Sequence, residues 1–415
     1  MQITSLGETR ILHPQEESVA RRRRPIRYAS ILLIAIFCCS VLYVFGMALL
    51  QSSQSNLLSF SDLIIPRLID VVIFLWLFWI GSSFGSFLNV VAWRMPRGES
   101  INGRSHCPRC QHQLAARDNF PVFGWLALRG RCRTCRLPIS ARYPIVESAV
   151  GMSIAFVGFA EINQIALPHR PHLGHVGPLG SPVVDAATLF ILAYHIFAIA
   201  FVWAMGLIRF DQRHLPRELS IFGFGVLITT MLGFPIVGIV PWQMDGGHLQ
   251  DAKSIFGGSY LDAWMRVLTA LVAAAFYARC LAPGLCRDAD PKFDPLGKST
   301  RRLIDLILVC AAASIVVGWQ MLPTVLILAS LISLPLQKRF PDSDAFGTFS
   351  LAMPVSLSLH IMLWRLLHQT WFWPSDGSQP IVLLIAAGVV LLIPNWLYEK
   401  PKLESPPTDS SSDEA

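Results

Sequence analysis

The sequence predicts an all-α, polytopic membrane protein: a bundle of about ten transmembrane helices with one small domain outside the bilayer. Of its 415 residues, 53% are hydrophobic and only 15% are charged. Charged residues make up about a quarter of a typical soluble domain. Apolar stretches of about 20 residues, long enough to cross a bilayer, recur along the chain. These observations exclude a large soluble core.

Ten stretches are apolar enough to be read as membrane spans. They are residues 28–50, 70–92, 143–162, 185–208, 219–241, 260–283, 303–318, 321–336, 348–367 and 380–398. The first is too long for the core of a signal peptide. The tail 399–415 is rich in Ser, Pro and acidic residues, which is typical of a disordered segment.

Positive charge alternates between the loops and predicts their orientation, because Lys and Arg gather on the cytosolic side of a membrane. The run Arg21–Arg24 places the N-terminal segment 1–27 in the cytoplasm. The loop 94–142 contains ten arginines and falls inside, whereas 163–184 contains Arg170 alone and falls outside. The inside loops account for the net charge of +7, so no nucleic-acid partner is needed.

The arginine-rich loop contains two C-x2-C pairs separated by 21 residues. The four cysteines are Cys107, Cys110, Cys132 and Cys135. Four thiolates on two turns suit tetrahedral zinc, and a closed set of four is typical of a structural site. The cytosol is reducing, so two disulfides are not expected there. The alternative is four free thiols in a loop.

Two motifs flank the cysteine pairs. GSSFGSFLNVVAWRMPRGES, from Gly81 to Ser100, carries small residues that let helices approach closely. PISARYPIVESAVG follows the pairs and places Glu147 inside the next span. A carboxylate in a membrane span is costly, so Glu147 is either functional or paired with Arg142.

These motifs and their order resemble the N-terminal half of bacterial type IV prepilin peptidases, over residues 80–150 or so. The resemblance implies a multi-pass protein of the bacterial inner membrane that cleaves the leaders of type IV prepilins or pseudopilins. It also implies N-methylation of the product with S-adenosylmethionine. The chain then divides into an additional N-terminal span (28–50), a first family span with the zinc domain (70–142) and a peptidase-like bundle (143–398).

The resemblance further implies two catalytic aspartates at the cytosolic ends of spans, which activate a water between them. The family's first aspartate lies seven residues before a proline, which corresponds here to Pro216 in LIRFDQRHLPRELS. Arg209 stands at that position, and Asp211 lies five residues before the proline. Either Asp211 serves as the first carboxylate, or that carboxylate is lost.

The family's second aspartate belongs to a GxGD motif, which this sequence lacks. Asp251, in HLQDAK, and Asp305, in RRLIDLILVC, are the two candidates. The charge pattern favours Asp305, because it falls on the cytosolic side with the cysteines, whereas Asp251 falls on the opposite side. The stretches GWQ and AFGTFSLAM, which follow Asp305, also resemble the family in their order.

The sequence therefore predicts a membrane aspartic endopeptidase that uses Asp211 and Asp305 on the cytosolic side. An alternative keeps the zinc domain and the membrane bundle but has no proteolytic activity, and acts as a binding partner in pilus or secretion assembly. A transporter would place charged groups deep in several spans, and the expected spans contain few.

The predicted topology can be tested with reporter fusions. A reporter fused after Arg129 should be cytosolic and one fused after His175 should be external, because the arginines are concentrated in the first of these two loops. The measurement is a pair of reporters active on opposite sides of the membrane. If both report the same side, the span 143–162 does not cross.

Overall fold

The computed structural model describes residues 14–54, 58–107, 109–163, 184–239, 260–287, 298–368, 370–374 and 380–398. These residues form helices and contain no strand, only two isolated β-bridges. The α-helices are α1 (Pro14–Gln54), α2 (Phe60–Arg94), α3 (Phe123–Ala127), α4 (Arg142–Ile162), α5 (Ala186–Phe210), α6 (Arg217–Gly233), α7 (Tyr260–Leu285), α8 (Lys298–Val317), α9 (Leu322–Arg339), α10 (Ala345–His368) and α11 (Pro380–Trp396). The all-α prediction is confirmed.

Apart from the five-residue α3, each of these helices overlaps one expected span, although α1 begins at Pro14 and not at 28, and α6 ends at Gly233 and not at 241. Six are long and apolar enough to cross a bilayer, namely α1, α2, α4, α5, α7 and α10, and α11 is a shorter apolar helix. The chain is thus a membrane protein. The break between α8 and α9 comes at Gly318, whose φ of 85° lies in the left-handed region that glycine adopts without strain after a helix.

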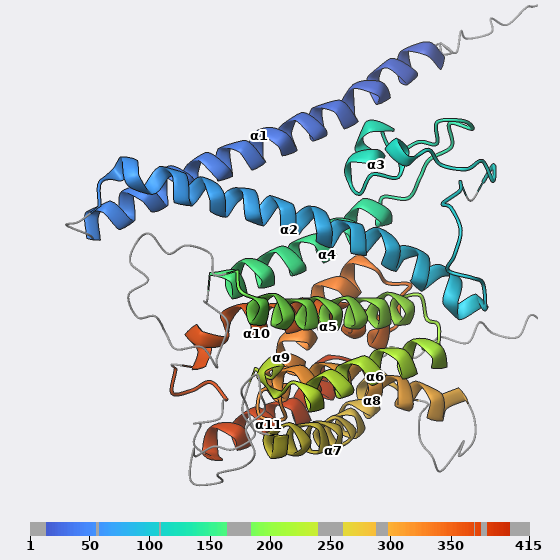
Figure 1. Cartoon of the computed structure of the whole chain (residues 1–415). Coiled ribbons are helices and arrows are strands. Elements are labelled where there is room, and N and C mark those ends of the chain that lie inside the picture. The colour runs from blue at the N-terminus through green and yellow to red at the C-terminus, as the bar shows by residue number, and fades with distance from the viewer. Residues whose placement is uncertain are drawn as a thin grey trace, which may run out of the picture. The chain divides into compact units, whose positions relative to one another are not determined.

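The chain forms two compact units. The first contains α1, most of α2, α3 and the first part of α4, and the second contains the end of α4 and α5 to α11 (Figure 1). Asp251 and the histidines at 169–175 lie outside the described residues, as does the tail 399–415.

In the first unit, α2 and α4 are held close by glycines. A Cβ on Gly81 would lie 2.9 Å from the Cα atom of Gly151, and one on Gly85 would lie 2.7 Å from the Cα atom of Glu147. Real side chains do not tolerate such distances, so the small residues noted in the sequence are required for this approach.

A polar cluster joins α1 to α2 in the same unit. Tyr43 of α1 donates a hydrogen bond to Asp70 of α2 at 3.0 Å, and Arg67 forms an ion pair with the same carboxylate at 2.8 Å. Asp70 is almost fully buried, so the arginine compensates a charge that would otherwise be costly there.

In the second unit, α5 packs against α10, and α8 packs against α5, α7 and α10 (Figure 1). The α5–α10 contact is also glycine-dependent: a Cβ on Gly206 would lie 2.5 Å from the carbonyl oxygen of Ser350. A Cβ on Gly347, in the first turn of α10, would lie 2.9 Å from the carbonyl oxygen of Arg209. This approach places the C-terminal end of α5 beside the N-terminal end of α10.

The glycine packing yields a test with a matched control. Gly85→Ala should lower the stability of the protein by about 1–3 kcal/mol, because overpacking forces α2 and α4 apart. Gly46→Ala, on α1, has nothing within 4 Å of the added Cβ and should be neutral or slightly stabilising. Thermal unfolding in detergent measures both, and equal midpoints for the two variants would contradict the packing argument.

Candidate functional site

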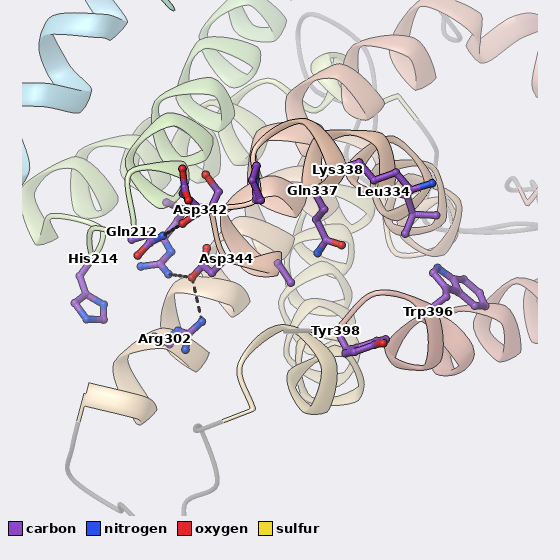
Figure 2. A pocket seen from close by; sticks show the side chains of 14 residues that line it. Gln212, His214, Arg302, Leu334, Gln337, Lys338, Asp342, Asp344, Trp396 and Tyr398 are labelled. Carbon is purple, nitrogen blue, oxygen red and sulfur yellow. Dashed lines mark hydrogen bonds and ion pairs between the residues drawn. The ribbon is translucent and has the colours of Figure 1, made fainter. Parts of the chain in front are cut away.

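A cavity of about 700 Å³ opens at one end of the second unit, where α5, α8, α9, α10 and α11 begin or end. Arg302, Asp342 and Asp344 lie on one side of it, and Trp396 and Lys338 lie on the other (Figure 2). Tyr398 also lines it. We call the charged part of the lining that contains Arg209, His214, Arg302 and Asp344 the ionic wall.

Asp305 lies directly behind this ionic wall, in the second turn of α8, and is 2% exposed. Its Oδ2 atom accepts hydrogen bonds from His214 Nδ1 at 2.9 Å and from Arg209 Nη1 at 3.3 Å. Its Oδ1 atom accepts one from the backbone amide of Leu215 at 3.4 Å. The predicted residue Asp305 is therefore a buried carboxylate held by two cationic or polar side chains, both of which line the cavity.

Arg209 also reaches a second carboxylate. Its Nη2 atom lies 3.8 Å from Asp344 Oδ2, and Arg302 lies 3.1 Å from the same oxygen. The other oxygen of Asp344 accepts a hydrogen bond from the amide of Gly347 at 2.7 Å, which caps α10. Figure 2 shows Arg302 and Asp344 facing one another beside the cavity.

The four groups form a line of alternating charge, from Arg302 through Asp344 and Arg209 to Asp305, and His214 adds a fifth group at the Asp305 end. Burial would make any of these charges costly on its own, and the alternation compensates them. In this arrangement a guanidinium is in contact with both carboxylates. A cation that bridges two carboxylates removes the like-charge repulsion that would make them share a proton.

Asp211 occupies a different position. It is the C-terminal cap of α5, and its backbone amide donates to the carbonyl of Leu207. The cavity is lined by its neighbours Arg209 and Gln212, and Asp211 is not among the described lining residues. The assignment of Asp211 as a catalytic carboxylate stays a prediction.

The four predicted cysteines converge in the first unit, and their sulfur atoms all lie within 4.8 Å of one another. The Cys107 and Cys135 sulfurs are 3.9 Å apart, and those of Cys110 and Cys132 are 4.0 Å apart. Four thiolates bound to one zinc at about 2.3 Å would be about 3.8 Å apart, so this donor set fits a tetrahedral metal.

The two C-x2-C pairs are built in the same way. The amide of the first cysteine in each pair, Cys107 or Cys132, donates to the carbonyl five residues later, at 2.9 Å in both. The fourth residue after that cysteine has a left-handed φ, 56° at Gln111 and 61° at Arg136. The turns aim both sulfurs of each pair to one side, as a shared metal requires.

Backbone amides of Cys135 and Thr134 point at the Cys132 sulfur and lower the pKa of that thiol to about 7. The amide of Leu137 lowers the pKa of Cys135, but burial and hydrogen bonds with the three other sulfurs outweigh it and raise the value to about 11. Because a metal binds thiolates, its binding has to displace the remaining protons.

Glu147 links the cysteine domain to α4. Its carboxylate accepts a hydrogen bond from the backbone amide of Val122 at 2.7 Å. Val122 has a φ of 60°, which is rare for a β-branched residue. Glu147 thus anchors a strained turn of the domain.

The cysteine domain also contains an ion pair. The Arg133 guanidinium binds Asp118 through two nitrogens and lowers the pKa of that carboxyl.

Comparison with known proteins adds to this geometry. Residues 79–160 match the family described as "Bacterial Peptidase A24 N-terminal domain". The chain is also 42% identical, over 212 residues, to a protein of Klebsiella pneumoniae named "Prepilin leader peptidase/N-methyltransferase", and the match covers 46% of this chain and 86% of that protein. The chain belongs to the prepilin leader peptidase/N-methyltransferase family.

Other relatives match different lengths of the chain. A "Prepilin leader peptidase/N-methyltransferase" of Myxococcus xanthus is 56% identical over 77 residues, which is 18% of this chain and 23% of that protein. One of Aeromonas hydrophila is 29% identical over 275 residues, 60% of this chain and 74% of that protein. No solved structure matches the chain.

The structure places three residues at the cavity that the sequence analysis did not assign to a site. Asp344, Arg302 and His214 contribute directly to the ionic wall. Asp344 had a usable signal, since it stands one residue before α10 and the AFGTFSLAM motif, where an aspartate typically caps a helix. Arg302 stands three residues before Asp305, which suggests an ion pair between the two, but the structure pairs Arg302 with Asp344. His214 carried no signal beyond being polar in a loop.

The metal assignment can be tested by substitution. Cys132→Ser should reduce bound zinc from about one per chain to near zero, because a structural site needs all four thiolates. Cys38→Ser changes an exposed cysteine of α1 and is the control. Zinc is measured by elemental analysis of the purified protein. The affinity of the wild-type site for zinc should fall as pH decreases, because protons compete for the thiolates. Equal zinc in both variants would contradict the assignment.

Proposed function

We propose that this chain is an aspartic-type endopeptidase that cleaves the leader peptides of type IV prepilins or pseudopilins on the cytosolic side. The proposal is carried by one observation: a protein of this family has a buried carboxylate, Asp305, next to a cavity at the ends of its helices. Carboxylates placed in this way activate water for attack on an amide.

The hydrolysis requires two groups with different tasks. One carboxylate takes a proton from a water molecule while the oxygen of that water forms a bond to the carbonyl carbon of the peptide. The other donates a proton to the leaving nitrogen as the C–N bond breaks. Asp305 supplies one of these groups, and Asp211 is the candidate that the sequence offers for the other.

The cysteine cluster has a supporting role in this proposal. Zinc held by Cys107, Cys110, Cys132 and Cys135 would fix the fold of the domain, and Glu147 would fix the domain on α4. The relatives' names include methyl transfer, which would use S-adenosylmethionine. No residue of this chain is assigned to that step.

The charge pattern of the loops supports a location in the bacterial inner membrane with the N-terminus in the cytoplasm. The partners would be membrane-bound prepilins or pseudopilins and the surrounding lipid. The arginine-rich loop 94–142 would then lie on the same side as the leader peptides.

One specific observation favours a second candidate function. Arg209 neutralises Asp305 and stands where the family's first aspartate is expected. A protein in which Arg209 stays paired with Asp305 would bind prepilins without cleaving them and would act in pilus or secretion assembly.

Cleavage of a co-expressed prepilin separates the two functions. Asp305→Asn should reduce cleavage at least about 100-fold, because an amide cannot exchange protons as a carboxylate does. Asp251→Asn should leave it unchanged, since the charge pattern puts Asp251 on the other side of the membrane. Cleavage is followed by the change in mass of the prepilin, with zinc content as the control for folding. No cleavage by the folded wild type would favour the binding function.

A further inference from the structure

The position of Arg209 raises the question of how the site becomes active. Its guanidinium touches Asp305 at 3.3 Å and Asp344 at 3.8 Å. Tight charge-assisted hydrogen bonds are about 2.7–2.9 Å long, so both contacts are loose. The Nε atom of Arg209 is buried and has no hydrogen-bond partner among the described residues. This arginine is therefore incompletely bound by its carboxylates.

Arg209 has another anchor close by. Its Nη1 atom donates to the carbonyl oxygen of Arg213 at 2.7 Å, which is shorter than its contact with either carboxylate, and the guanidinium lies 4.4 Å over the ring of Phe346. The carbonyl belongs to the turn that follows α5. The Nη1 atom thus has a closer partner in this carbonyl than in Asp305, so the guanidinium keeps a hydrogen bond when its contacts with the carboxylates break.

Asp344 is better placed than Asp211 to work with Asp305. Asp305 contacts the Nη1 atom of this guanidinium and Asp344 contacts its Nη2 atom. Asp344 lines the cavity and is 13% exposed, so a peptide bound there can reach it. The helix cap fixes one oxygen of Asp344, and the other oxygen contacts Arg302 at 3.1 Å and Arg209 at 3.8 Å.

We propose that Arg209 is a latch between Asp305 and Asp344, and that these two carboxylates form the working pair when the guanidinium withdraws. This inference rests on the proposed function and assigns its second carboxylate to Asp344. With Arg209 between them, the guanidinium compensates both negative charges, so like charge does not drive either carboxylate to take up a proton. When it withdraws, His214 still contacts Asp305 and Arg302 still contacts Asp344, but no cation bridges the two carboxylates. Their like charge then favours one proton held by the pair, which supplies one base and one acid.

The first test does not depend on activity. In Arg209→Gln, Asp305 and Asp344 should hold one shared proton in the folded protein. In the unfolded chain, the same carboxylates lose their protons above about pH 4. The folded state then binds more protons than the unfolded state, so stability falls as pH rises from about 5 to 8. We expect the unfolding midpoint to drop by about 2 °C more over this range than in the wild type.

The control variants identify the second carboxylate. Arg209→Gln/Asp344→Asn should lose this pH dependence, because only one carboxylate remains. Arg209→Gln/Asp342→Asn should keep it, since Asp342 is an exposed carboxylate on the same loop. Midpoints are measured on the full chain in detergent by tryptophan fluorescence. If Arg209→Gln does not accumulate, Arg209→Met is used in its place, because the methionine keeps an aliphatic side chain near Phe346. A pH dependence that survives Asp344→Asn would overturn the proposal.

The second test uses leader cleavage of a co-expressed prepilin. Arg209→Gln should cleave about 10-fold faster than the wild type, because the latch is removed. Adding Asp344→Asn should abolish this cleavage, while adding Asp211→Asn should not. Glu218→Gln, an exposed carboxylate in the first turn of α6, is the matched control.

The outcomes of the two tests are distinguishable. If no variant cleaves, the proposed function fails, and the pH profiles still decide whether Asp305 and Asp344 share a proton. If Asp211→Asn abolishes cleavage and Asp344→Asn does not, the function stands and the pair is misassigned. A rate for Arg209→Gln no higher than the wild-type rate would show that Arg209 is not a latch.

Discussion

The arrangement of the second unit depends on one buried cation. Arg209 is 2% exposed at the end of α5, and a charge in such a place is retained only where carboxylates compensate it. Asp305 of α8 and Asp344 at the start of α10 do so, and they bring three helix ends together around one guanidinium. The cavity is formed beside this junction, so the same interaction that joins the helices also sets the chemistry of the cavity wall.

Close packing by glycine makes this junction possible. Because Gly206 and Gly347 let α5 and α10 approach, the carbonyl of Arg209 lies next to the first turn of α10. Asp344 caps that turn and reaches the guanidinium. In the first unit, Gly85 similarly brings α2 against Glu147, whose carboxylate then holds the Val122 turn of the cysteine domain. In both units a small residue determines where a carboxylate lies.

The alternating charge of the site also bears on proton transfer. Arg209 lies between Asp305 and Asp344 in a line of four alternating charges, and it compensates both carboxylates. Stability and proton transfer are then in conflict, as they often are at functional sites. Whether the guanidinium moves decides which of the two prevails.

The sequence by itself determined the helices, the cysteine cluster and the family. The apolar stretches are long, and two C-x2-C pairs can converge through their local turns, so both follow from short-range pattern. Asp305 was also predicted, from the charge of the loops on either side. The tertiary structure alone decided what Asp305 contacts. Arg209, His214 and Asp344 come from parts of the chain that are distant in sequence from Asp305. No local pattern shows that α5 ends where α8 and α10 begin.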